Sequence, residues 1–206
     1  MKRPLLIIFL VLLFDQAIKI YIKTHFILGE EHRIASWFII HFTENNGMAF
    51  GMTFGGQYGK IFLSVFRIAA VTLIGYYLWT LVKRSAPVGL ISSFALIFAG
   101  ALGNILDSTF YGILFSDSGY ELARFMPKEG GYAGLLHGKV VDMFYFPLLE
   151  GHFPSWVPFW GSEEFLFFRP VFNLSDSAIT VGVVLILLFQ KKFYPKTESH
   201  MKEEKF

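Results

Sequence analysis

Long apolar runs constrain this chain more than any other feature of its sequence. A helix needs roughly 20 mostly apolar residues to cross about 30 Å of hydrocarbon. Runs of about that length fall at 5–22, 61–82, 88–106 and 172–189. Only 17% of the 206 residues are charged, whereas a soluble domain carries about a quarter. We therefore predict an all-α integral membrane protein with four transmembrane helices.

The N-terminal run begins like a secretory signal peptide, with Lys2 and Arg3 followed by an apolar core. No small-residue cleavage site follows, and the helical pattern continues to Ile22. Basic residues also flank the other runs, at 83–84 and 191–192, on the side of the short connections. Because cytoplasmic flanks are enriched in Lys and Arg, both termini are predicted to lie inside. Residues 191–206 then form a charged cytoplasmic tail.

Two long segments would lie outside the membrane, at 23–58 and 108–171. The first contains a β-branched and aromatic stretch at 36–43 and a glycine-rich stretch at 45–51, which predicts one or two strands with a turn. The second is rich in aromatic residues, including Trp156 and Trp160. Aromatic side chains gather at membrane interfaces, so this segment is predicted to fold as a cap on the membrane surface.

Polar residues inside the apolar runs fall at one depth. At about 1.5 Å per residue from the basic inner ends, Asp15 and Lys19 lie roughly 18 and 24 Å up, and Asp176 roughly 22 Å. Asn104 and Asp107 lie about 24 and 28 Å above the start of their helix. Polar groups of separate helices at one depth indicate a shared site. Ionisable residues in a membrane span are functional candidates by default.

Each candidate also has a structural interpretation. Asp15 and Lys19 are four residues apart and can simply neutralise each other. Asn104 and Asp107 can mark an ordinary helix end, after a small-residue surface at Gly100 and Gly103 that permits close helix packing.

The acidic residues of the last run are open to the same question. Asn173 can be a helix N-cap, with Asp176 a first-turn acid favoured by the helix dipole. Asp142, between Val-Val and Met-Phe, is harder to explain structurally, because no Lys or Arg follows within its apolar run.

Several chemistries find little support in the composition. Cysteine is absent, so the chain has no disulfide, thiol nucleophile or Cys-ligated metal. His137, Glu150 and His152 match no standard metal-ligand spacing. The net charge of +2 is too small to indicate a nucleic-acid partner. We expect no cofactor and no metal.

Five motifs together resemble those of lipoprotein signal peptidase, also called signal peptidase II, over most of residues 1–190. They are Asp15-x-x-x-Lys19, Asn45-x-Gly47-x-Ala49-Phe50, Gly100-Ala101-Leu102-Gly103-Asn104-x-x-Asp107, Val140-Val141-Asp142 and Phe172-Asn173-Leu174-Ser175-Asp176. The resemblance implies one membrane-embedded peptidase domain over 1–190, with a small extracytoplasmic β-platform and a mobile segment that covers substrate. It implies an aspartic dyad of Asp142 and Asp176.

The resemblance also assigns the residues around that dyad. Asn45, Gly47, Asn104 and Asn173 would line or support the site together with Asp107, and Asp15 and Lys19 would be supporting polar residues. The substrates would be diacylglyceryl-modified prolipoproteins, cut at the outer face of the bacterial cytoplasmic (inner) membrane in contact with membrane lipids. The antibiotic globomycin would bind in the same cleft.

The chain departs from the family pattern in two places. Family members commonly carry Arg directly after the aspartate of the third-helix motif, where this chain has Ser108. Arg67, Arg124 and Lys139 are candidates to supply the missing cation. The loop between Asp107 and Asp142 is also long, so 117–138 and 153–168 are interpreted as elaborations of the cap with no assigned role.

Two other function classes stay open at this point. A small transporter or proton-relay subunit would also place acids at membrane depth, but it needs polar residues at several depths, and the inner halves of the last three runs hold almost none. A membrane scaffold that docks a partner on the aromatic cap would tolerate Asp→Asn changes at both Asp142 and Asp176.

Overall fold

A computed structural model of the chain describes residues 2–46, 56–147, 149–152, 156, 164–167 and 170–194. The helices are α1 (Lys2–His25), α2 (Gly56–Lys83), α3 (Val88–Leu106), α4 (Gly112–Leu114), α5 (Leu174–Leu188) and α6 (Gln190–Phe193). A π-helical segment, η2 (Asp107–Tyr111), joins α3 to α4. The strands are β1 (Glu31–Ala35), β2 (Phe38–Asn45), β3 (Val140–Tyr145), β4 (Leu149–His152) and β5 (Glu164–Phe167).

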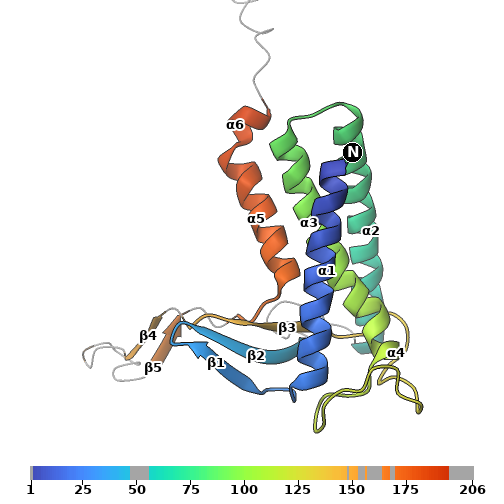
Figure 1. Ribbon diagram of the computed structural model, residues 1–206, viewed down its shortest axis with the longest axis vertical. Helices are drawn as coiled ribbons and strands as arrows, with labels where there is room; N and C mark the ends of the chain where they lie inside the picture. The colour runs from blue at the N-terminus through green and yellow to red at the C-terminus, as the bar shows by residue number, and fades with distance from the viewer. Residues whose placement is uncertain are drawn as a thin grey trace, which may run out of the picture.

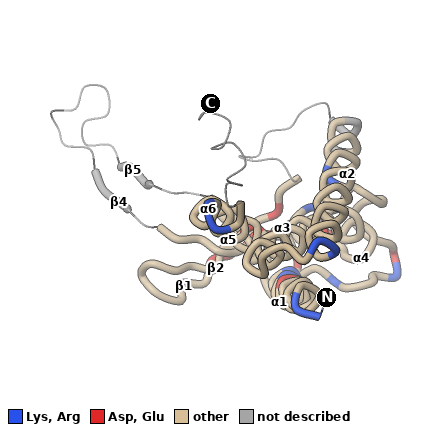
Figure 2. The backbone as a smooth tube through the Cα atoms, turned by 90° about the horizontal axis from the view of Figure 1, so that it is seen from above, with Lys and Arg blue, Asp and Glu red and all other residues tan. Residues whose placement is uncertain are grey.

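The architecture is a helical bundle standing on a small sheet (Figure 1). The N-terminus, the α2–α3 connection and α6 lie at one end of the bundle, and the strands lie at the other. Seen from the first end, basic residues mark the start of α1 and α6 (Figure 2). This arrangement agrees with the predicted placement of the basic flanks on one side.

Within the described residues, three helical segments are long and apolar enough to cross a membrane: Lys2–His25, Ile61–Lys83 and Val88–Leu114. The third continues past the predicted end at 106, because the π-helical turn carries the backbone into α4. The predicted fourth span is shorter than expected. It begins at Leu174 rather than Phe172, because Asn173 caps it, and it has 15 residues.

The sheet confirms the predicted strands and adds a third from the second long segment. β1 and β2 form an antiparallel hairpin, and β2 pairs with β3 so that Thr43 lies opposite Asp142. The strand order in this sheet is β1-β2-β3. β4 and β5 form a separate two-stranded sheet within the aromatic segment. The pairing therefore carries Asp142, 35 positions after Asp107, back onto the ends of the helices.

Small residues let α1, α3 and α5 approach closely. An ideal Cβ at Gly103 would lie 2.2 Å from Ser175 Oγ and 2.8 Å from Asp15 Oδ2, and one at Gly100 would lie 2.2 Å from the Ser175 carbonyl oxygen. The close-packing interpretation of these two glycines is confirmed. The same approach brings Asn104 and Asp107 within reach of the other helices.

We predict that Gly103→Ala destabilises the protein, by about 1–3 kcal/mol as is typical of overpacking. The added methyl group has no space between α1 and α5. The measurement is thermal unfolding in detergent micelles. Gly134→Ala is the matched control, because a Cβ there meets nothing within 4 Å. Equal unfolding temperatures for the two variants would contradict the packing argument.

Candidate active site

Asp142 is positioned by strand pairing on both sides of β3. Besides the pairing with β2, an isolated antiparallel bridge joins Phe144 to Phe172. In this bridge the Phe144 amide donates to the Phe172 carbonyl at 2.8 Å, and the Phe172 amide donates back at 3.1 Å. The segment that leads into α5 is therefore tied directly to the strand that carries Asp142.

Asp176 is positioned by the cap of α5. The Asp176 amide donates to Asn173 Oδ1 at 2.9 Å, and the Asn173 amide donates to Asp176 Oδ2 at 3.3 Å. These reciprocal bonds form a capping box, which fixes the first turn of a helix. The predicted roles of Asn173 as N-cap and of Asp176 as first-turn acid are confirmed. The capping role leaves the second carboxylate oxygen of Asp176 available to other partners.

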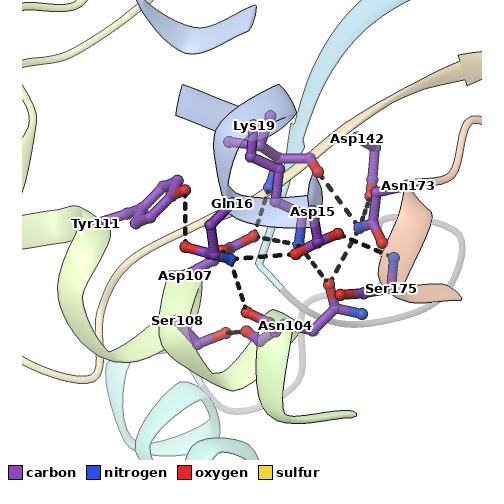
Figure 3. Close-up of polar contacts among 12 residues, drawn as sticks. Asp15, Gln16, Lys19, Asn104, Asp107, Ser108, Tyr111, Asp142, Asn173 and Ser175 are labelled. Atoms are coloured by element: carbon purple, nitrogen blue, oxygen red, sulfur yellow. Dashed lines mark hydrogen bonds and ion pairs between the residues drawn. The ribbon is translucent and has the colours of Figure 1, made fainter. Parts of the chain in front are cut away.

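A set of asparagine amides links the two carboxylates. Asn173 Nδ2 donates to Asp142 Oδ1 at 2.7 Å, while the same residue caps Asp176. Asn104 Nδ2 donates to Asp176 Oδ1 at 2.8 Å, and Asn45 Nδ2 donates to Asp142 Oδ2. Asn173 thus donates to the Asp142 carboxylate through its side chain (Figure 3) and to the Asp176 carboxylate through its backbone amide. Amide donors of this kind orient carboxylates without adding charge.

The environment of Asp142 favours its protonated form. Burial raises the pKa of Asp142 to about 7, and the charge of Asp176 adds to the rise. The hydrogen bonds from Asn173 and Asn45 and the charge of Lys19 act in the opposite direction on that pKa. Desolvation and a like charge are the two physical causes that keep one member of a carboxyl pair neutral near pH 7. These surroundings therefore favour a neutral carboxyl at Asp142 up to about pH 7.

A buried lysine supports this pair from α1. Lys19 Nζ lies 3.0 Å from Asp15 Oδ2 and 2.8 Å from Asp107 Oδ2, and all three side chains are fully buried. Lys19 also donates to Asn104 Oδ1 at 2.9 Å. Asp15 in turn accepts the Ser175 amide at 2.9 Å. The ion pair between Asp15 and Lys19 is confirmed, and it belongs to a larger network that joins α1, α3 and α5 (Figure 3).

Two members of this network escaped the sequence analysis. Gln16 Nε2 donates to Asp107 Oδ1 at 2.9 Å, and Gln16 Oε1 accepts from the Tyr111 hydroxyl at 3.1 Å. A glutamine beside Asp15 in an apolar helix was a usable signal. Nothing in the sequence indicated Tyr111, because the helical continuation through η2 was not predicted.

A second buried ion cluster fixes the sheet to the helices, and it too was missed. Lys23 Nζ forms an ion pair with Glu44 of β2 and donates to Ser118 Oγ at 2.8 Å. Lys139 Nζ reaches the other oxygen of Glu44 at 3.2 Å. Tyr132 packs against both lysines, with its ring 4.9 Å from Lys23 Nζ. Lys23 is four residues after Lys19 on one helix face, and that spacing could have indicated it.

The remaining predicted residues fall in different places. Gly47 lies outside the described residues. The Ser108 hydroxyl donates to the Asn104 carbonyl at 3.0 Å, four residues before it on the same helical stretch. Among the described residues no group of three or more His, Asp or Glu is suited to a metal ion.

The fold and these contacts define a class: a helical membrane protein in which one network of buried acids, asparagines and a lysine lies where its sheet meets its helices. The family model for signal peptidase (SPase) II matches residues 7–191. A lipoprotein signal peptidase of Porphyromonas gingivalis is 53% identical over 194 residues, which cover 94% of this chain and 83% of that protein. One of Amoebophilus asiaticus is 37% identical, covering 87% of this chain and 73% of that protein. The chain belongs to the signal peptidase II family.

Solved structures support the fold. Two, each described as a bacterial membrane enzyme, superpose with TM-scores of 0.62 and 0.61 at 23% and 24% sequence identity. The first match covers 98% of this chain and 95% of the other chain, and the second covers 93% and 94%. The overall architecture is thus shared over nearly the whole length.

Proposed function

We propose that the protein is an aspartic endopeptidase that removes signal peptides from diacylglyceryl-modified prolipoproteins. Membership of the signal peptidase II family supports the reaction and the substrate class. The observation that carries the assignment of the site is that one residue, Asn173, donates to the Asp142 carboxylate through its side chain and to the Asp176 carboxylate through its backbone amide. The peptidase domain is assigned to residues 1–190 and the cytoplasmic tail to 191–206.

The chemistry follows from the different surroundings of the two acids. With its raised pKa, Asp142 is assigned as the protonated member, which donates a hydrogen bond to the scissile carbonyl oxygen. Asp176, ionised, takes a proton from a water as the water oxygen bonds to the carbonyl carbon. The tetrahedral intermediate then collapses, the C–N bond breaks, and the leaving amine takes a proton from the pair. The titration belongs to the pair as a whole.

The orientation of the helices in the membrane determines where the substrate would bind. We place α5 together with α6 as a fourth, shorter membrane element and both termini in the cytoplasm, so that the sheet faces the extracytoplasmic side of the inner membrane. The segment at 108–171 is the predicted cap in this arrangement. The acyl chains of the precursor then stay in lipid, and its scissile bond lies at the level of Asp142 and Asp176. Globomycin would occupy the same cleft.

The test of this function is cleavage of a synthetic diacylglyceryl-modified precursor by the purified protein, with the unmodified precursor alongside. We expect cleavage of the lipidated peptide only, undiminished by a chelator, because two carboxylates activate water without a metal. Loss of activity on chelation would contradict the aspartic mechanism. Proton-coupled transport by reconstituted protein without any peptide cleavage would instead favour the transporter interpretation.

We predict that the rate of cleavage falls as the pH rises through about 7. Below this value Asp142 holds its proton, and above it the proton is lost, because the pKa of Asp142 is raised to about 7. The donor to the scissile carbonyl then disappears, and the pair becomes doubly charged. The measurement is kcat/KM against pH, which reports the free enzyme. An alkaline limb that stays flat to pH 9 would contradict the assignment of Asp142.

A further inference from the structure

Arg67 is a cation inside the apolar span of α2 whose side chain faces the protein. Ser64 and Val71, three residues before it and four after it, are buried, and Arg67 itself is half-buried. The intervening Val65, Phe66 and Ile68 are exposed. This periodicity places Arg67 on the inward stripe of the helix rather than toward lipid. An inward-facing arginine within a span is expensive and indicates function.

The inward face of α2 contacts the loop that precedes β3, the strand that carries Asp142. The Ser64 hydroxyl donates to the Leu136 carbonyl at 3.2 Å, and Leu136 precedes Asp142 by six positions. Arg67 lies one turn along the helix from Ser64, away from the sheet. Its guanidinium interacts electrostatically with Asp176 and, less strongly, with Asp142. Arg67 therefore adds a positive charge that acts on the two acids from α2, a helix separate from the α1 network.

The other candidate cations are engaged elsewhere. Arg124 is exposed and lies 3.9 Å from Glu129. Lys139 lies 3.2 Å from Glu44. Of the three cations considered as substitutes for the guanidinium missing at Ser108, Arg67 is the one whose charge acts on both acids.

We propose that Arg67 is a positioning residue whose charge holds Asp176 ionised as the base while Asp142 keeps the proton. This proposal rests on the proposed function. A cation favours the charged form of an acid close to it, and the charge of Arg67 interacts with Asp176. Asp176 then stays the base and Asp142 stays the proton donor, and the two acids do not exchange these roles freely. The other charged groups described on the elements packed here pair with one another: Asp15 and Lys19 of α1 with Asp107 of η2, and Glu44 of β2 with Lys139 before β3.

The test compares Arg67→Gln with Arg67→Lys, using cleavage of the diacylglyceryl-modified precursor. We expect Arg67→Gln to lower kcat about tenfold and to leave KM within about twofold of wild type. The variant weakens ionisation of the base Asp176 and leaves substrate binding intact. The acidic limb of its pH profile moves to higher pH, because the cation that favours the ionised base is gone. Arg67→Lys keeps the charge, so most of kcat and the position of the limb are recovered. Arg124→Gln is the matched control and retains wild-type kinetics.

Unfolding temperature, measured for every variant, separates misfolding from a catalytic effect. A pH profile and kcat for Arg67→Gln that match wild type would overturn the proposal, as would equal losses in Arg67→Gln and Arg67→Lys. Asp142→Asn and Asp176→Asn, measured in the same assay, separate failure of the Arg67 proposal from failure of the proposed aspartic dyad. If these are inactive and Arg67→Gln is normal, only the role of Arg67 fails. If they are active, the pair itself is wrong.

Discussion

Asp142→Asn and Asp176→Asn are each expected to lower cleavage of a lipidated precursor by at least about 10³-fold, the scale of a lost acid or base. An amide in place of Asp176 accepts no proton from water. An amide in place of Asp142 still donates a hydrogen bond but cannot share a proton with its neighbour. The measurement is single-turnover cleavage of the diacylglyceryl-modified peptide by purified variants.

Folding must survive for this result to be informative, and the contacts around the two acids favour survival. Asparagine is nearly isosteric with aspartate, and at 176 its side-chain oxygen can still accept the Asn173 amide in the capping box. The control is Asp117→Asn, at an exposed aspartate in the loop before β3. Near wild-type cleavage by either site variant would contradict the assignment. A scaffold that works through its aromatic cap would tolerate both changes.

The second large effect is expected at Lys19, where Lys19→Met removes the one cation from two buried carboxylates. Asp15 and Asp107 each lie within 3.0 Å of Lys19 Nζ in a fully buried cluster. Removing one partner of a buried ion pair typically costs about 3–5 kcal/mol, because the remaining charge stays uncompensated. We expect a correspondingly lower unfolding temperature in detergent and loss of inserted protein.

A double variant tests whether the stranded carboxylates are what destabilises Lys19→Met. Adding Asp107→Asn to Lys19→Met removes one stranded charge, so the double variant should be more stable than Lys19→Met alone. Lys128→Met, at an exposed position, is the control. If the double variant is less stable than Lys19→Met, the carboxylates are not what destabilises the single variant.

The sequence predicted much of this site because membrane burial makes polar residues conspicuous. Asp15, Lys19, Asn104 and Asp176 stood out as polar residues at one depth in separate helices, and their side chains do meet. The approximate helix bounds followed from apolar length. The predicted start of the last helix, at 172, was two residues early, although Asn173 was also considered as its N-cap.

What the sequence could not predict depends on contacts between distant segments. The bridge between Phe144 and Phe172, which carries Asp142 toward Asn173, has no signature in either segment. The ion pair of Lys23 with Glu44 joins a helix to a strand that local patterns treat separately. Such pairings are fixed by tertiary packing, so neither periodicity nor composition reveals them.

The most direct test of the central claim is a pH titration of the protonated carboxyl stretch by infrared difference spectroscopy on wild type and the two Asp→Asn variants. Coupled acids should give one neutral carboxyl with a midpoint near 7 in wild type, absent in Asp142→Asn and shifted to lower pH in Asp176→Asn. The shift is expected because the charge of Asp176 contributes to the raised pKa of Asp142. A midpoint unchanged by Asp176→Asn would show that the two acids do not interact, which contradicts a shared proton.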